Sequence, residues 1–83
     1  MAGAQNVLGV KVQQKGETLR VDKVNPTLRY YGFAKAGTAE GDPGWMIFEA
    51  TIDGDGDIIQ TLYPNGSAHY AYTWTGRAGY AYS

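Results

Sequence analysis

The chain has 83 residues, of which seven are basic, eight are acidic, one is a histidine and none is a cysteine. This length allows one domain with one core, the lack of cysteine excludes disulfides, and a single histidine argues against a zinc site. The balanced charge argues against nucleic acid as a partner, and no apolar run reaches the roughly 20 residues that span a membrane.

The first segment with a strand pattern covers residues 5–13, where Leu8, Val10 and Val12 alternate with glycine and polar residues. A period of two is typical of a half-buried strand. We expect residues 1–16 to form either an extended arm or a strand, and such a strand could pair with a neighbouring subunit as easily as with its own chain. The chain begins without a basic region followed by an apolar one, so the sequence predicts no secretory signal and synthesis in the cytoplasm.

Two further strands are predicted before the middle of the chain. The first covers residues 18–22, after a Lys-Gly turn. The second covers residues 28–35, after Pro26, and its bulky side chains on both sides predict that it is buried on both faces. Residues 36–44 are rich in glycine and predict an exposed loop, which lacks the lysine and the following helix of a phosphate-binding loop.

The second half of the chain predicts a meander of short strands. Residues 45–52 form a nearly continuous apolar run that favours a central strand, and Asp-Gly pairs at 53–56 predict a tight turn into a strand at 57–63. A Pro-Asn-Gly turn then leads to the last segments. The fold class expected from these strands and turns is all-β, with residues 1–83 forming a single small antiparallel sandwich or open barrel of about six to seven strands.

The most regular pattern lies in the last third, where aromatic side chains recur at every second residue in two arms, residues 70–74 and 80–82. If the arms pair as a hairpin, their aromatic side chains share one face. As structure, they form a core or a subunit interface. As function, an exposed row of such rings would be a platform for sugar rings, bases or a protein partner.

The acidic stretch at residues 53–57 places carboxylates at alternate positions, as the start of an EF-hand loop does. The pattern then fails, because Ile58 stands where glycine is needed and Pro64 where a bidentate glutamate belongs. A polar hairpin turn is the favoured interpretation, and no metal or cofactor is expected. A weak surface calcium site is the alternative.

Catalysis would need converging groups, and the one candidate is His69 with Asp57 or Glu49 as an acid–base pair. His69 alternates with the aromatic residues of its segment and is expected on the solvent side. No nucleophile or second base is placed beside it, so we predict that the protein is not an enzyme.

A further pattern runs from residue 31 to residue 83. It includes Tyr-Gly-Phe-Ala at 31–34, Gly-Thr-Ala at 37–39 and Asp-Pro-Gly-Trp at 42–45, followed by the two turns, Trp74, Arg77-Ala78 and a final Tyr-Ser. In these features the sequence resembles short virion-associated proteins of tailed bacteriophages. Family members carry basic residues after the tryptophan strand begins, whereas this chain has Met46, Phe48 and Glu49. No shared electrostatic role is therefore carried over.

The resemblance implies a structural virion component in the capsid decoration, neck or tail, with other virion proteins and copies of itself as partners in a symmetric assembly. A small domain without disulfides or metal gains stability from such contacts. The alternatives are a carbohydrate- or receptor-binding β module with an exposed aromatic row, and a nonstructural phage protein that binds a host factor. The expected contact residues are Val7, Leu8, Val10, Val12, Tyr70, Tyr72, Trp74, Tyr80 and Tyr82.

Overall fold

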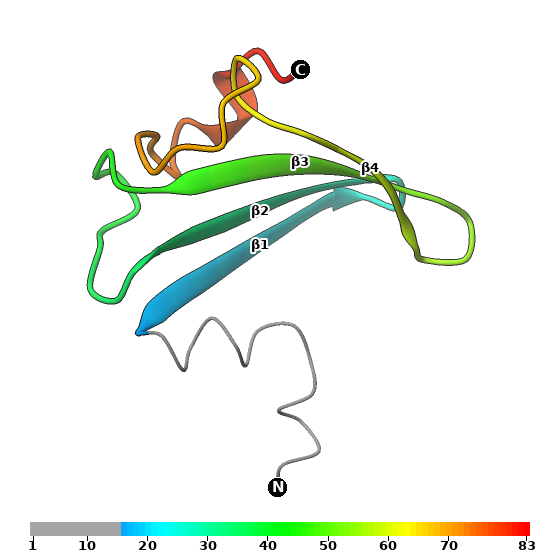
Figure 1. Cartoon of the computed structure of the whole chain (residues 1–83). Coiled ribbons are helices and arrows are strands. Elements are labelled where there is room, and N and C mark those ends of the chain that lie inside the picture. The colour runs from blue at the N-terminus through cyan, green and yellow to red at the C-terminus, as the bar shows by residue number, and fades with distance from the viewer. Residues whose placement is uncertain (1–15) are drawn as a thin grey trace, which may run out of the picture.

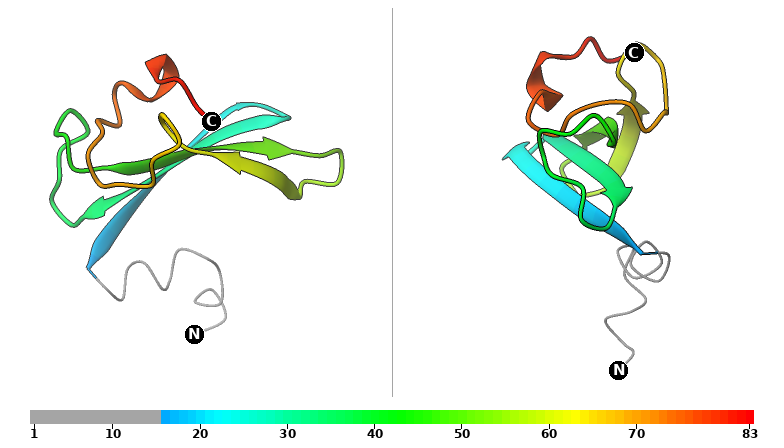
Figure 2. Two further views of the ribbon diagram at one scale, coloured as in Figure 1. Left: turned by 45° about the horizontal axis from the view of Figure 1, so that its top comes forward. Right: turned by 90° about the vertical axis from the view of Figure 1, so that its left-hand side faces the viewer.

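The computed structural model describes residues 16–83 (Figure 1). Four antiparallel strands form one open sheet in chain order, and a single 3-10 turn, η2, follows them. The elements are β1 (Glu17–Asn25), β2 (Leu28–Lys35), β3 (Met46–Ile52), β4 (Ile58–Leu62) and η2 (Arg77–Gly79). The C-terminal segment, residues 63–83, returns over one face of the sheet (Figure 2).

The all-β prediction is confirmed, since four strands make up nearly all the regular structure of the described residues and the one helical element is the 3-10 turn η2. Each strand predicted between residues 18 and 63 has a counterpart, and β3 is an interior strand between β2 and β4, as its apolar run indicates. A sandwich or barrel with six to seven strands is not shown, because residues 16–83 form one sheet with four strands. The strand predicted at residues 5–13 lies outside the described residues.

The predicted hairpin between residues 70–74 and 80–82 is wrong. The two arms do not pair with each other; Tyr72 forms an isolated bridge with Trp45, and Tyr82 forms one with Pro64. The physical reason lies in the connection, where successive amides donate to carbonyls three residues earlier, from Gly76 to Thr73 and from Arg77 to Trp74. These turns wind the chain into η2, so the two arms do not run edge to edge.

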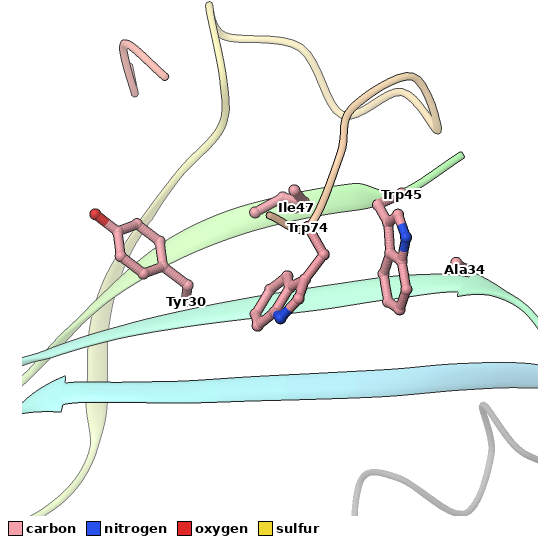
Figure 3. Packing of buried hydrophobic residues seen from close by; sticks show 5 residues of the cluster. All are labelled: Tyr30, Ala34, Trp45, Ile47 and Trp74. Carbon is pink, nitrogen blue, oxygen red and sulfur yellow. The ribbon is translucent and has the colours of Figure 1, made fainter. Parts of the chain in front are cut away.

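The side chains of β2 are buried on both faces, as its composition predicts, because residues 30–34 are all buried. Alternate residues of a strand point to opposite faces, so the sheet carries two apolar clusters. The face beneath the C-terminal segment, which we call the covered face, holds the cluster of Tyr30, Ala34, Trp45, Ile47 and Trp74 (Figure 3). The opposite face, which we call the second face, holds Tyr31, Phe33, Ala50 and Ile52.

The covered face depends on a close approach at Gly32 on β2. A Cβ atom at this position would lie 2.5 Å from Cε3 of Trp74 and 3.2 Å from Cε3 of Trp45. Because glycine has no side chain, the Trp74 indole packs directly on the backbone of β2. The two indoles, with centroids 5.9 Å apart, then fill the space between the sheet and the C-terminal segment.

We predict that Gly32→Ala lowers the free energy of unfolding by about 1–3 kcal/mol, because the added methyl group overpacks the contact with Trp74. Gly41→Ala is the control, since a Cβ there meets no atom within 4 Å. It should change stability by less than about 0.5 kcal/mol. Urea unfolding followed by circular dichroism measures both variants, and equal stabilities would contradict the packing described for Gly32.

Candidate interaction surfaces

Four of the five aromatic residues expected at an interface are packed within the protein. Trp74 is 4% exposed, and Tyr72, Tyr80 and Tyr82 are partly buried against its cluster. Their rings pack edge to face in sequence, with 5.0 Å between the centroids of Tyr72 and Tyr80 and 6.5 Å between those of Tyr80 and Tyr82. This geometry is favourable for aromatic pairs, and it makes the row part of the core.

The hydroxyl groups of these tyrosines are satisfied by the C-terminal segment itself. Tyr82 donates to the carbonyl of Arg77 at 2.6 Å, and Tyr72 donates to the carbonyl of Pro64 at 3.2 Å. The hydroxyl of Tyr80 accepts from the amide of Thr73 at 2.9 Å. Each bond fixes backbone that lies in no strand. The hydroxyl groups therefore stabilise the conformation of the C-terminal segment, and the rings pack the segment against the sheet.

Arg77 ties the C-terminal segment to the first strand. Its guanidinium lies 4.5 Å from the centroid of the Trp74 ring, and its Nε donates to a carboxylate oxygen of Asp22 on β1 at 2.9 Å. Its NH1 group also donates to the carbonyl of Trp74 at 2.9 Å. Stacking, charge pairing and a backbone bond together suit arginine and not lysine.

Burial on the covered face raises the pKa values of two tyrosines. It raises the pKa of Tyr82 well above the usual range, and the neighbouring Tyr30 and Glu49 add to this effect. Burial also raises the pKa of Tyr30, with a further contribution from Glu49. Both shifts favour the neutral phenol, which is the form a packed ring keeps.

Tyr70 is the one predicted aromatic contact residue that remains largely exposed, at 52%. Its hydroxyl donates to a carboxylate oxygen of Glu17 at 3.0 Å, and both burial and this bond raise its pKa. It borders an open groove of about 660 Å³ at the start of β1. The groove is lined by Gly16, Glu17, Lys35, Thr38, Gly44 and Tyr70.

The second face carries an aromatic stack that sequence reasoning did not single out. Phe48 stacks on Tyr31 with centroids 5.0 Å apart and an angle of 15° between the rings, and it also contacts Phe33 and Tyr63. Leu19 and Met46 extend the cluster. Among residues 16–83 its members come from β1, β2 and β3, with Tyr63 directly after β4. The bulky residues on both sides of residues 28–35 were the signal that could have found it.

The side chain of Asp53 organises the acidic turn between β3 and β4. Oδ1 of Asp53 accepts from the amides of Asp55 and Asp57, both at 2.9 Å, and Gly56 adopts a positive φ of 87°. Carboxylate oxygens of Asp53, Asp55 and Asp57 lie within 4.8 Å of one another. The bonds from Asp53 give this cluster a role in turn formation, which agrees with the favoured interpretation of the sequence.

The structure does not bring together the groups considered for catalysis. His69 is exposed, and within residues 16–83 no hydrogen bond joins it to Asp57 or Glu49. The strand residues Val7, Leu8, Val10 and Val12 lie outside the described part of the chain. In that part, no helix has the length and apolar character needed to cross a membrane.

Comparison of the chain with protein-family models, with curated proteins and with solved structures found no match. The site is therefore interpreted from its own geometry.

We predict that Asp53→Ala lowers the free energy of unfolding by about 0.5–2 kcal/mol, because two backbone amides lose their acceptor. Asp53→Asn should keep most of the stability, since its amide oxygen can accept the same bonds. Calcium at millimolar concentration should change neither the heat in a titration nor the melting temperature. A calcium-dependent rise in melting temperature that disappears in Asp53→Asn would instead indicate a metal site.

The raised pKa of Tyr82 predicts a loss of stability in alkaline solution. The folded state holds the phenolic proton more tightly, so the unfolded state ionises first as the pH rises through about 10. The contribution of Tyr82 to the free energy of unfolding is therefore constant below that pH and falls above it. Tyr82→Phe has no phenolic proton to lose. Its free energy of unfolding should therefore fall less steeply above about pH 10, by up to about 1.4 kcal/mol per pH unit.

Urea unfolding of the native protein and Tyr82→Phe, repeated from about pH 8 to 11, measures this difference. At neutral pH the variant should be less stable by about 1 kcal/mol, because the bond to the Arg77 carbonyl is lost. Parallel pH profiles above pH 10 would contradict the assigned burial of the hydroxyl.

Proposed function

We propose that the protein is a structural component of a tailed-phage virion, in the capsid decoration, neck or tail, and acts by protein–protein assembly. The observation that carries the proposal is on the second face, where Val21 is 44% exposed opposite Tyr31 and so continues the aromatic stack to the surface of the protein. An apolar sheet face is stabilised when another protein layer covers it. The resemblance of residues 31–83 to virion-associated proteins is the reason for proposing a phage particle as the assembly.

The proposal also accommodates the finer fold expected from the sequence. A sheet with four strands becomes part of a sandwich or barrel with six to seven when further strands add to it. The segment of Val7, Leu8, Val10 and Val12 has the alternation of such a strand, in its own subunit or in a neighbouring one. In this proposal the buried aromatic residues shape the subunit, and the contacts come from the second face, the open strand edges and Tyr70.

Mass spectrometry of purified particles of the encoding phage tests this function. The protein should remain with the particles through a density gradient, at a fixed ratio to the major capsid protein. A ratio giving hundreds of copies indicates capsid decoration, whereas one or two dozen indicate a neck or tail ring. Detection in the infected-cell lysate but not in particles would overturn the proposal and favour a nonstructural role with a host factor.

Variants of β1 then test whether the second face makes the contact. Val21 is 44% exposed and lies opposite Tyr31 in the sheet register, so Val21→Lys places a charge beside the aromatic stack. Val24→Lys is the matched control, because Val24 is 48% exposed near the β1–β2 turn. The first variant should be depleted from particles by roughly tenfold or more, as expected from about 1.4 kcal/mol of lost contact, and the second should not.

A carbohydrate- or receptor-binding module is the second candidate, and the exposed ring of Tyr70 beside its groove is the observation that favours it. The row as a whole cannot serve as the platform, since Trp74 is 4% exposed. Glycan-array binding that Tyr70→Ala abolishes without loss of folding would support this candidate. No binding by the native protein would exclude it for the glycans tested.

A further inference from the structure

We propose that Asn65 is a site of spontaneous covalent modification, where the side-chain amide is lost after attack by the backbone nitrogen of Gly66. The modification belongs to the class of amide hydrolysis, with water as the only co-reactant. It goes beyond the proposed function and does not rest on it, because the reaction needs only the turn that contains these two residues.

The residue that follows each asparagine distinguishes Asn65 from the other two asparagines of the chain. Asparagine is a thermally labile residue, and its cyclisation needs a backbone N–H on the next residue with little bulk around it. Gly66 has the N–H and no side chain. Asn25 precedes Pro26, which has no backbone N–H, and Asn6 precedes a valine, whose branched side chain crowds the nitrogen. The reaction is therefore expected at Asn65.

The chemical steps balance with water alone. The Gly66 nitrogen forms a bond to Cγ of Asn65, and its proton leaves with the side-chain NH2 group as ammonia. Water then opens the resulting five-membered imide at either of its two carbonyl carbons. One opening gives aspartate, and the other gives isoaspartate, in which the main chain runs through Cβ and Cγ. Both products carry a new negative charge at the turn.

The turn at residues 63–67 places the reacting groups at the surface. Asn65 and Gly66 are both exposed, and both adopt a positive φ, of 52° and 71°. The amide of Ser67 closes the turn on the carbonyl of Pro64 at 2.8 Å. Exposed turns of this kind open locally at a low cost in free energy, so the reactive conformation is within reach of the folded protein.

Hydrogen bonds within the closed turn restrain the attacking nitrogen. The amide of Gly66 donates to the carbonyl of Tyr63 at 2.9 Å, and the amide of Asn65 donates to the carbonyl of Ala81 at 2.6 Å. The first of these bonds must break before the nitrogen can turn toward Cγ. The rate of modification therefore depends on how firmly residues 81–83 hold the turn closed.

Isoaspartate at this position would weaken the attachment of the C-terminal segment. It adds one atom to the main chain between the amides of residues 65 and 66. Their bonds to Ala81 and Tyr63 then cannot both keep their length and direction. Because the bond to Ala81 joins the turn to the end of the chain, the modified protein should unfold at a lower temperature than the native protein.

Incubation of the purified full chain in mildly alkaline heavy-oxygen water, followed by proteolysis and mass spectrometry, tests the chemistry. Asn65 should lose its amide and gain one heavy oxygen, while Asn25 keeps its amide. The chain unfolded in urea should react faster by roughly tenfold or more, because the Gly66 nitrogen is then free. An intact Asn65 in the folded protein after the unfolded chain has fully reacted, or equal rates in both, would overturn the inference.

Two variants test whether opening of the C-terminal segment controls the rate. Tyr82→Phe loses the bond to the Arg77 carbonyl, so Asn65 should react faster by roughly fivefold. Asp53→Ala is the matched control, because it weakens the turn between β3 and β4 instead, and Asn65 should react in it at the native rate. Equal rates at Asn65 in the native protein and Tyr82→Phe, or equal acceleration in both variants, would reject control by the segment.

Discussion

The contact between the Trp74 indole and the backbone of Gly32 is the interaction on which the rest of the described structure depends. An indole can lie this close to a strand where no Cβ intervenes, and Gly32 supplies that gap on β2. Once Trp74 is seated beside Trp45, its neighbour Arg77 reaches Asp22 on β1. The irregular C-terminal segment thereby forms the second layer of the domain, in the place where a larger domain would have another sheet or a layer of helices.

This arrangement also decides which surfaces are left for partners. The rings of the tyrosines that looked most suitable for recognition pack against the core, and their hydroxyl groups form hydrogen bonds with the backbone of the C-terminal segment. Two exposed apolar residues remain outside this packing: Val21 beside the aromatic stack of the second face, and Tyr70 beside its groove, which are 44% and 52% exposed. The proposed function depends on contacts at such exposed residues.

The sequence predicted the strands better than their packing. Pro26 with the bulky side chains that follow it at residues 28–35, and the apolar run at 45–52, located β2 and β3, and Asp-Gly located the turn that Asp53 organises. It could not show that the aromatic residues at 72 and 82 pair with Trp45 and Pro64 and not with each other. A period of two reports which side chains share a side, whereas the partner is chosen by distant contacts, here the space above Gly32.

The most direct test of this account is the proton NMR spectrum of the full chain in solution. If Trp74 packs on β2, the α-protons of Gly32 lie against the indole, so they should be displaced from the usual glycine position and show nuclear Overhauser contacts to the Trp74 ring. Gly32 protons at ordinary positions, without contacts to either tryptophan in the folded protein, would contradict the account.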